Sequence, residues 1–290
     1  LSDIFKQMDQ DTQSRDELVT RIFTQVKHLL QVATDYGFDK NLWQNYLTYF
    51  LITNENPFSI TCEKVGANDG SVNVFAKNDF KVFYNLFHYD FSFIEKELGI
   101  DCFSIISDYK AIVKKELMYN KNVSEKVQAL SEKLAKAANA DEFFDIVTEF
   151  YKAYGVGMFG LNKAFRISAT ENGKLTFNPI NNMDKVVLDD LIGYEIQKKK
   201  LVENTENFVQ GRKANNALLF GDSGTGKSTS IKAIVNEYYD QGLRMIEIYK
   251  HQFKDLSNVI AAIKNRNYKF IIYMDDLSFE ELVLNLKFFK

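Results

Sequence analysis

The stretch that decides the fold spans residues 221–229 and reads Gly221-Asp222-Ser223-Gly224-Thr225-Gly226-Lys227-Ser228-Thr229. A short apolar run, Ala217–Phe220, precedes it, and a helical pattern over Lys227–Tyr239 follows it. A strand, a glycine-rich loop and a helix that opens with Lys-Ser, in that order, are typical of a phosphate-binding loop. The stretch therefore predicts an α/β fold with an anion-binding loop at the start of a helix.

The residue types in this loop suit phosphate chemistry. Glycines let successive backbone N–H groups approach phosphate oxygens, and the helix N-terminus adds partial positive charge. Lys227 is expected to reach the β- and γ-phosphates, and the hydroxyl of Ser228 is expected to be a Mg²⁺ ligand. The candidate nucleotide-binding residues of the loop are Gly221, Ser223, Gly224, Thr225, Gly226, Lys227, Ser228 and Thr229.

An acidic segment is expected to complete this site. The apolar run Phe270–Met274 leads into Asp275 and Asp276, about fifty residues downstream, as a separate strand–helix–strand crossover allows. Hard Mg²⁺ prefers oxygen ligands and binds through few carboxylates. We therefore expect Asp275 to belong to the metal shell and Asp276 to orient or deprotonate the attacking water. Glu280 and Glu281 are reserve candidates for that second role.

The rest of residues 184–290 alternates between helix-like and strand-like segments. Helices are predicted at 194–209 and over Leu256–Lys264, and a strand is predicted over Arg244–Tyr249. Apolar strands separated by helices of this length favour a parallel sheet that helices cover on both faces. Residues 184–290 are therefore predicted to form the nucleotide-binding core.

Residues 1–155 are predicted to form a separate, mostly helical domain. Apolar residues recur there at helical spacing. The expected helices lie at 14–37, 41–52, 104–118, 124–138 and 141–154. Phe80, Phe83, Phe87 and Phe91 also recur at helical spacing, and this stripe predicts a packing seam rather than a ligand site.

Residues 156–183 are expected to connect the two domains through a β-hairpin. Two short β-like runs, Ala164–Ser168 and Leu175–Ile180, flank the dipeptide Asn172-Gly173. Asn-Gly favours the tight turns that join antiparallel strands.

The composition excludes several classes of protein. The formal charge is 36 − 39 = −3 and 46% of the residues are hydrophobic, which suits a globular protein and gives no basic excess for nucleic-acid binding. The apolar runs are too short to span a membrane, and the first residues lack the basic and apolar regions of a secretory signal, so we expect neither feature. Cys62 and Cys102 lie far apart and form no CxxC pair, so we expect a cytoplasmic protein without membrane contact.

Two further patterns are interpreted as structural. Gly155-Val156-Gly157-Met158-Phe159-Gly160 has the spacing of a dinucleotide-binding motif, but it follows a helix rather than a strand. Its glycines are expected to end that helix and bend the chain. Lys198-Lys199-Lys200 is interpreted as a solvated helix face.

The core segments together resemble the AAA+ ATPases. The resemblance rests on the glycine-rich loop, the strand that leads into Asp275-Asp276, and Leu191-Ile192-Gly193-Tyr194. A narrower motif set is similar to an uncharacterised bacterial branch of predicted AAA+ ATPases. It consists of Gly193-Tyr194-Glu195, Glu203-Asn204-Thr205, Asn215-Asn216 and Asp275-Asp276-Leu277-Ser278-Phe279-Glu280.

The resemblance carries expectations about ligands and behaviour. It implies that Leu191, Ile192 and Gly193 pack against the adenine. It also implies a cytoplasmic ATPase that changes shape with its nucleotide and usually works as an oligomer.

The chain departs from the AAA+ pattern in two places. The family commonly has Asp-Glu where this chain has Asp275-Asp276. The sequence also ends 290 − 276 = 14 residues after Asp276, whereas the family continues with a strand that carries a polar sensor, a further strand, an arginine finger and a helical lid. We therefore expect an incomplete core within these residues and a longer natural protein.

The function expected from the sequence is Mg²⁺-dependent ATP hydrolysis coupled to conformational change or to remodelling of a protein partner. The helical domain is expected to contact that partner. A scaffold or switch that binds ATP with little turnover is an alternative, and so is a kinase for a small molecule, because a phosphate-binding loop specifies the donor and not the acceptor. A GTPase is less favoured, because the sequence has no Asn-Lys-x-Asp segment that would read guanine.

Overall fold

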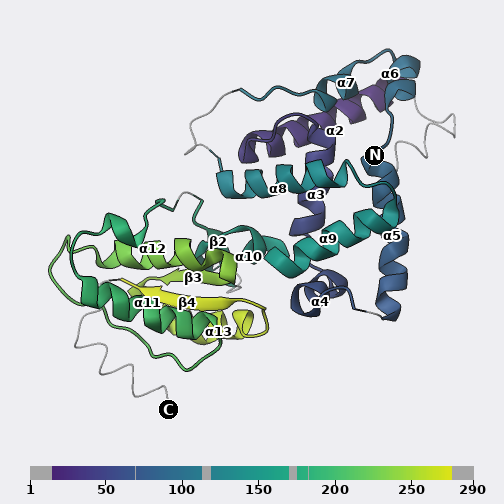
Figure 1. The fold of residues 1–290 in the computed structure, drawn as a ribbon. Coiled ribbons are helices and arrows are strands. Elements are labelled where there is room, and N and C mark those ends of the chain that lie inside the picture. Colours follow the sequence, from purple (N-terminus) through teal and green to yellow (C-terminus); the bar gives the residue numbers. More distant parts are fainter. Residues whose placement is uncertain (1–14, 69, 113–118, 170–174, 182, 276–290) are drawn as a thin grey trace. The chain divides into compact units, whose positions relative to one another are not determined.

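A computed structural model describes residues 15–68, 70–112, 119–169, 175–181 and 183–275 of the 290-residue chain (Figure 1). The chain divides into two compact units, Leu1–Leu161 and Asn162–Lys290. In the described parts, the first unit is built from helices and the second contains a sheet.

The described part of the first unit consists mainly of helices. They are α2 (Arg15–Tyr36), α3 (Leu42–Thr53), α4 (Pro57–Val65), α5 (Ser71–Phe87), α6 (Ser92–Leu98), α7 (Cys102–Ser107), α8 (Lys121–Leu134), α9 (Ala140–Tyr154) and α10 (Gly157–Leu161). The structure confirms the helices predicted at 14–37, 41–52, 124–138 and 141–154, to within about one helical turn at each end.

Local sequence explains where α9 begins and ends. The side chain of Asn139 accepts hydrogen bonds from the backbone N–H groups of Asp141 and Glu142, which caps the first turn. Gly155 ends the helix with φ 83°, as glycine commonly does. The Gly155–Gly160 segment therefore ends α9 and leads into α10, as the sequence predicts.

The bounds of one helix predicted for this unit were wrong, and α4 was not predicted. Of the helix expected over 104–118, the described part ends at Ser107, and Tyr109 instead pairs with Lys40 in an isolated antiparallel bridge. Residues 113–118 lie outside the described residues. Helix α4 begins at Pro57. Proline is favoured in the first turn of a helix, and here Asn56 and Ser59 form a reciprocal capping box around it.

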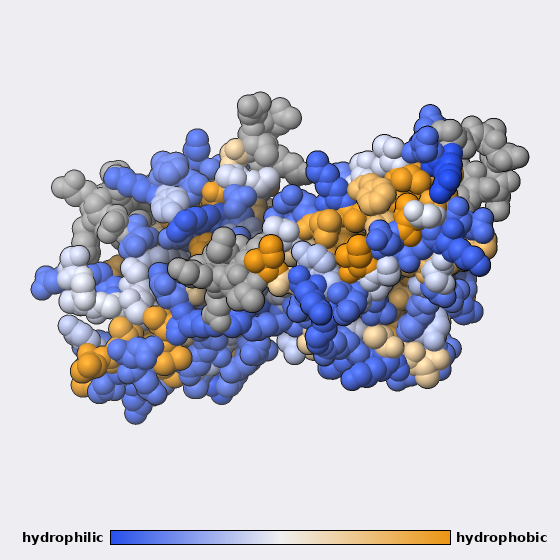
Figure 2. All heavy atoms as spheres, turned by 90° about the horizontal axis from the view of Figure 1, so that it is seen from above, coloured by the Kyte–Doolittle hydropathy of each residue, from blue (hydrophilic) through white to orange (hydrophobic). Residues whose placement is uncertain are grey.

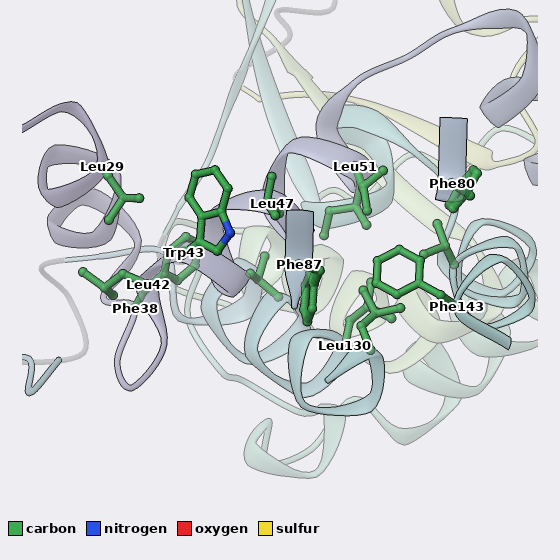
Figure 3. Packing of buried hydrophobic residues seen from close by; sticks show 14 of the residues in the cluster. Leu29, Phe38, Leu42, Trp43, Leu47, Leu51, Phe80, Phe87, Leu130 and Phe143 are labelled. Carbon is green, nitrogen blue, oxygen red and sulfur yellow. The ribbon is translucent and has the colours of Figure 1, made fainter. Parts of the chain in front are cut away.

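Aromatic and aliphatic side chains pack together in the core of the first unit (Figure 3). The ring centroids of Phe80 and Phe144 lie 5.2 Å apart in an edge-to-face contact, and those of the stacked pair Phe91 and Phe103 lie 4.4 Å apart. Phe87 is also buried, with 2% exposure. These contacts confirm the aromatic stripe as a packing seam, although Phe91 lies at the start of α6 rather than in α5.

The second unit contains a mixed sheet in the order β2-β1-β3-β4. Its strands are β1 (Ala164–Ala169), β2 (Leu175–Pro179), β3 (Leu243–Ile248) and β4 (Lys269–Met274). The β1–β3 and β3–β4 pairs are parallel, whereas β1 and β2 pair antiparallel. The parallel pairing expected within residues 184–290 is confirmed for β3 and β4, and the antiparallel pairing of β1 with β2 confirms the strands predicted for the hairpin. The structure also places β1 and β2, expected as a connector, within this sheet.

Helices flank the sheet on both faces (Figure 1). They are α11 (Glu195–Val209), α12 (Lys227–Tyr238) and α13 (Leu256–Ile263), with short 3-10 turns η2 (Leu188–Asp190), η3 (Tyr239–Gln241) and η4 (Lys250–Asp255). Figure 1 shows α12 and α13 on opposite sides of β3 and β4. The predicted helices 194–209, Lys227–Tyr239 and Leu256–Lys264 are confirmed, as are the strands near Arg244–Tyr249 and Phe270–Met274.

Alternation along the strands decides which side chains face α12. Leu243 and Met245 of β3 share a buried cluster with Ile234 of α12, and Ile271 and Tyr273 of β4 pack against that cluster. Side chains two residues apart on a strand lie on the same face. The face of β4 that carries Tyr273 is therefore the face that α12 covers.

The surface drawn in Figure 2 is mainly hydrophilic with separate hydrophobic areas. In the second unit, the most exposed large apolar side chains of the described residues are Ile192 (95%) and Phe220 (84%). Within the described ranges, no helix combines the length and the apolar content that crossing a bilayer requires.

Candidate functional site

The glycine-rich loop leads directly into α12. Gly226 is the N-cap residue of this helix and has φ 79°, and Gly224 has φ 78°. Both conformations lie in the left-handed region that favours glycine. A Cβ atom at position 226 would also lie 2.8 Å from Cδ2 of Leu191. Gly226 therefore allows both the turn and the close approach of the segment around Leu191.

The first turn of α12 presents polar groups beside this loop. The backbone N–H and the hydroxyl of Ser230 both donate to the carbonyl oxygen of Gly226, each at 2.8 Å. Thr229 is half-buried in the same turn, whereas Ser223 is exposed in the loop. The first N–H groups of a helix have no partner within the helix, so this end carries partial positive charge.

The side chain of Lys227 folds back over the loop. Its Nζ donates to the carbonyl oxygens of Gly221 at 3.0 Å and Asp222 at 2.8 Å. The hydroxyl of Thr225 donates to the same Asp222 carbonyl at 2.8 Å. These contacts hold an ammonium group at the loop, where an anion would need a positive partner.

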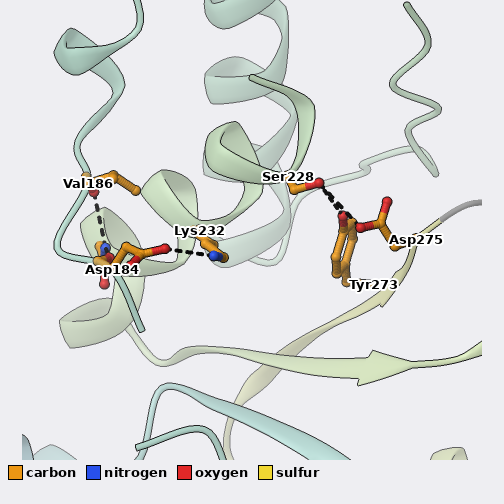
Figure 4. Close-up of polar contacts among 7 residues, drawn as sticks. Asp184, Val186, Ser228, Lys232, Tyr273 and Asp275 are labelled. Atoms are coloured by element: carbon orange, nitrogen blue, oxygen red, sulfur yellow. Dashed lines mark hydrogen bonds and ion pairs between the residues drawn. The ribbon is translucent and has the colours of Figure 1, made fainter. Parts of the chain in front are cut away.

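The end of β4 meets the start of α12 at Ser228 (Figure 4). The Ser228 hydroxyl donates to Oδ2 of Asp275 across 3.4 Å, and the Tyr273 hydroxyl donates to Oγ of Ser228 at 2.9 Å. The first contact is long for an O–H···O bond and the second is near the usual distance. The structure thus brings the predicted loop serine and the first predicted acid together.

Tyr273 is a hydrogen-bond donor in this group. Burial raises the pKa of Tyr273 to about 12, because an apolar setting disfavours the charged phenolate. The phenol therefore keeps its proton at neutral pH.

The segment around Leu191 lies beside the loop through separate contacts. Lys198 Nζ donates to the Leu191 carbonyl oxygen at 2.8 Å and forms an ion pair with Glu195 at 2.9 Å. Gly193 and Tyr194 follow with φ 83° and 58°. Lys198 is therefore a local support, and the interpretation of all three lysines as a solvated face was wrong for this residue, whose side chain is only 15% exposed.

Residues just upstream of Leu191 are fastened to α12 (Figure 4). Lys232 forms an ion pair with Asp184 at 2.7 Å, and Asn236 donates to the carbonyl oxygens of Asp184 and Val186 at 2.8 and 3.0 Å. The hydrogen bond from Lys232 holds the pKa of Asp184 below its ordinary value. The helix that carries Ser228 thus also positions the chain that leads to Leu191.

The strand predicted over Ala217–Phe220 is absent from the structure. These described residues form no ladder, and Leu218 and Phe220 are 54% and 84% exposed. A strand needs a hydrogen-bonded neighbour, and the described sheet ends at β4 without pairing to this segment. Apolar content and a following glycine loop were therefore insufficient grounds for a strand here.

The chain before this segment is instead held by α11. The side-chain amide of Asn204 donates to the carbonyl oxygen of Asn215 at 2.8 Å and accepts from its N–H at 2.9 Å. This paired contact gives a physical role to two motif residues, because it fixes the backbone a few residues before Gly221.

The structure brings some of the predicted site residues together and not others. Lys227, Ser228 and Asp275 lie together, and Leu191 lies next to Gly226. Ile192 is 95% exposed. Asp276, Glu280 and Glu281 lie outside the described residues.

Sequence reasoning missed Tyr273 and Lys198 as parts of this site. For Tyr273 a signal was present, because it stands two residues before Asp275 on a strand and therefore shares its face. For Lys198 there was none, because its acceptor is a backbone carbonyl seven residues away.

Comparison with protein families gives a match over the second unit. Residues 160–290 match the model of a family described as "Protein of unknown function (DUF815)", a range that begins close to the start of the second unit at Asn162. That description assigns no activity. Searches of curated proteins and of solved structures found no match.

Proposed function

We propose that the second unit binds Mg·ATP at the 221–229 loop and hydrolyses it. The observation that carries the proposal is the 3.4 Å contact between the Ser228 hydroxyl and the Asp275 carboxylate. It joins the start of the loop helix to the end of a parallel strand, where ligands of α/β proteins commonly bind. The loop also brings Lys227 to the same helix start, and residues 221–224 are exposed.

The donor set at this point suits magnesium. Ser228 supplies a hydroxyl oxygen and Asp275 a carboxylate oxygen, and Mg²⁺ prefers oxygen ligands, few of them from carboxylates. Ser228 and Asp275 would hold the ion, which would supply charge neutralisation for the phosphates when bound.

The chain itself would contribute the remaining positive potential. Lys227 would exchange its contacts with the Gly221 and Asp222 carbonyls for phosphate oxygens, and the N-terminus of α12 would face the same anion. Asp276 would orient or deprotonate the attacking water, and this role stays a prediction. Hydrolysis would then proceed by in-line attack on the γ-phosphate.

Leu191, Ile192 and Gly193 would form the adenine side of the site. Leu191 lies beside Gly226, and Ile192 offers an apolar side chain that is 95% exposed. An exposed aliphatic group gains favourable burial when a flat aromatic base covers it. The contact of Lys198 with the Leu191 carbonyl would keep this segment in place.

The resemblance to AAA+ ATPases supports the wider proposal. Hydrolysis would drive a conformational change that remodels a protein partner, with the helical unit contacting that partner and the protein acting as an oligomer in the cytoplasm. Loss of the γ-phosphate is the event that would release the change.

Phosphate release from excess ATP and Mg²⁺ tests the proposal on the full chain. We expect repeated turnover by the wild type, at least about a tenfold lower rate in Asp275→Asn, and no change in Asp240→Asn. Asp240 is a matched control, because it lies in η3 before the amino end of β3, whereas Asp275 follows the carboxyl end of β4. Binding of ATP without turnover would indicate a nucleotide-dependent scaffold, and absence of ATP binding would refute the site.

A further inference from the structure

The Tyr273 hydroxyl lies beside the proposed site. It belongs neither to the glycine-rich loop nor to the acidic pair Asp275-Asp276. Tyr273 lies on β4 and its ring packs against the buried cluster that α12 shares with β3. From there its hydroxyl reaches Oγ of Ser228 at 2.9 Å. Figure 4 shows the phenol and the Asp275 carboxylate converging on the same serine.

The direction of these hydrogen bonds follows from the chemistry of the groups. A carboxylate oxygen only accepts, so the Ser228 hydroxyl must donate to Asp275. Its single hydrogen is then directed to Asp275, and the Tyr273 phenol, which also lies within hydrogen-bonding reach of Asp275, is the donor in its 2.9 Å contact with Ser228. The order of donation is therefore Tyr273 to Ser228 to Asp275.

This order determines what Ser228 still offers. A serine oxygen has two acceptor positions, and Tyr273 occupies one of them while the hydrogen is directed to Asp275. One lone pair remains. The hydroxyl is thereby restricted in rotation, and restricting a ligand before it binds lowers the entropy that binding must overcome.

We infer that Tyr273 is a positioning residue that orients the Ser228 hydroxyl for divalent-cation binding. The inference rests on the proposed function, since it assigns a support to the metal side of that site. Groups that orient metal ligands in this way commonly change metal affinity when they are removed. Tyr273 itself is not assigned a contact with metal or nucleotide.

A phenylalanine at position 273 separates orientation from packing. Tyr273→Phe keeps the ring in the cluster and removes only the hydroxyl. Tyr238→Phe is the matched control, because Tyr238 is a buried tyrosine of α12 whose hydroxyl donates to Glu206 Oε1 at 3.1 Å, outside the site.

The experiment measures binding of a fluorescent ATP analogue to the full chain while Mg²⁺ is varied. We expect Tyr273→Phe to need about three- to tenfold more Mg²⁺ for half-maximal binding. We expect Tyr238→Phe to match the wild type, and analogue binding without Mg²⁺ to be equal in all three proteins. Circular dichroism confirms that each variant is folded.

A second background tests whether Tyr273 acts through Ser228. The double variant Ser228→Ala, Tyr273→Phe should need the same Mg²⁺ concentration for half-maximal binding as Ser228→Ala alone. A Tyr273→Phe protein with the Mg²⁺ dependence of the wild type, or an equal added shift in the alanine background, would overturn the inference. If the wild type failed to bind the analogue at all, the proposed function itself would fail.

Discussion

Two glycine-rich segments of this chain share backbone features but differ in their surroundings. Gly155–Gly160 and Gly221–Gly226 both contain glycines with positive φ, among them Gly155 at 83° and Gly226 at 79°. Five of the six residues of the first segment are buried, whereas residues 221–224 of the second are exposed. A glycine pattern therefore predicts a turn of the backbone, whereas the exposure of that turn determines whether a ligand can reach it.

The buried segment satisfies its polar groups within the protein. Val156 donates its N–H to the buried carboxylate of Glu63 at 3.0 Å, and Lys126 donates to the Gly160 carbonyl oxygen at 3.3 Å. A buried polar group needs such a partner. With these groups engaged, the segment has a structural role.

The exposed segment instead gathers groups that suit an external anion. It opens a 12-residue helix, its lysine lies over the loop carbonyls, and its serine meets an acid from β4. The α10 helix after the buried segment has only 5 residues, so its dipole is short. The same residue type thus serves packing in one unit and, in our proposal, ligand binding in the other.

The largest difference between the two segments is expected when the lysine at each segment is replaced and ATP affinity is measured. Lys227→Ala should weaken ATP binding by at least about a hundredfold, because charge-assisted contacts with phosphate are strong. Lys126→Ala should leave ATP affinity unchanged, since its amine serves the Gly160 carbonyl. Equilibrium titration with ATP checks both, and equal effects of the two variants would contradict the distinction.

The next prediction distinguishes the reasons why Gly160 and Gly224 are needed. A Cβ at Gly160 would lie 2.8 Å from the backbone carbon of Gly155, whereas a Cβ at Gly224 would meet nothing within 4 Å. Gly160→Ala should lower the free energy of unfolding by about 2–3 kcal/mol through overpacking, without changing ATP affinity. Gly224→Ala should cost about 1–2 kcal/mol from its positive φ alone.

Urea unfolding and ATP titration measure these two glycine variants. Because φ strain disturbs the loop itself, Gly224→Ala should also weaken ATP binding. Normal stability in Gly160→Ala, or normal ATP binding in Gly224→Ala, would show that the two glycines are not distinguished in this way.

The sequence was most informative where a pattern repeats over many residues. Helices α2, α9, α11 and α12 follow their apolar periodicity, and β3 and β4 follow their apolar runs. The proximity of Ser228 and Asp275 was also predictable, because both follow from a phosphate-binding loop and an acid at a strand end.

The missed features depend on backbone pairing and backbone acceptors, which a local side-chain pattern does not reveal. Ala217–Phe220 has strand-like residues but no hydrogen-bonded neighbour among the described strands. The bridge between Lys40 and Tyr109 replaces a helix where local pattern alone favoured one. Lys198 was interpreted as solvated because its acceptor is a backbone carbonyl, which no side-chain pattern reveals.

A smaller effect on ATP binding is expected from Lys198, which supports the segment around Leu191 beside the loop. Lys198→Met should weaken ATP binding about threefold, because the Leu191 carbonyl loses a charge-assisted hydrogen bond. Lys199→Met is the matched control, since its only described ion pair, with Glu203, is long at 3.9 Å and exposed. Competition with a fluorescent ATP analogue measures both. An equal effect of the two substitutions would remove the support assigned to Lys198.

The smallest effect concerns the ion pair between Asp184 and Lys232. The lowered pKa of Asp184 means that its carboxylate stabilises the fold above the ordinary carboxyl range near pH 4 and loses this contribution as the pH falls through the lowered pKa. Asp184→Asn should cost a few tenths of a kcal/mol at pH 7, because the pair is exposed. The difference from wild type should vanish in acid, as urea unfolding at each pH will measure. A difference that grew in acid would reverse the assigned sign.

Amide NMR of the 14 glycines tests the central claim most directly. In protein labelled with ¹⁵N-glycine, addition of Mg·ATP should shift the resonances of Gly221, Gly224 and Gly226, because their backbone would lie against the phosphates. Gly155, Gly157 and Gly160 should keep their positions. Unchanged resonances at the 221–226 loop under saturating Mg·ATP would contradict the account.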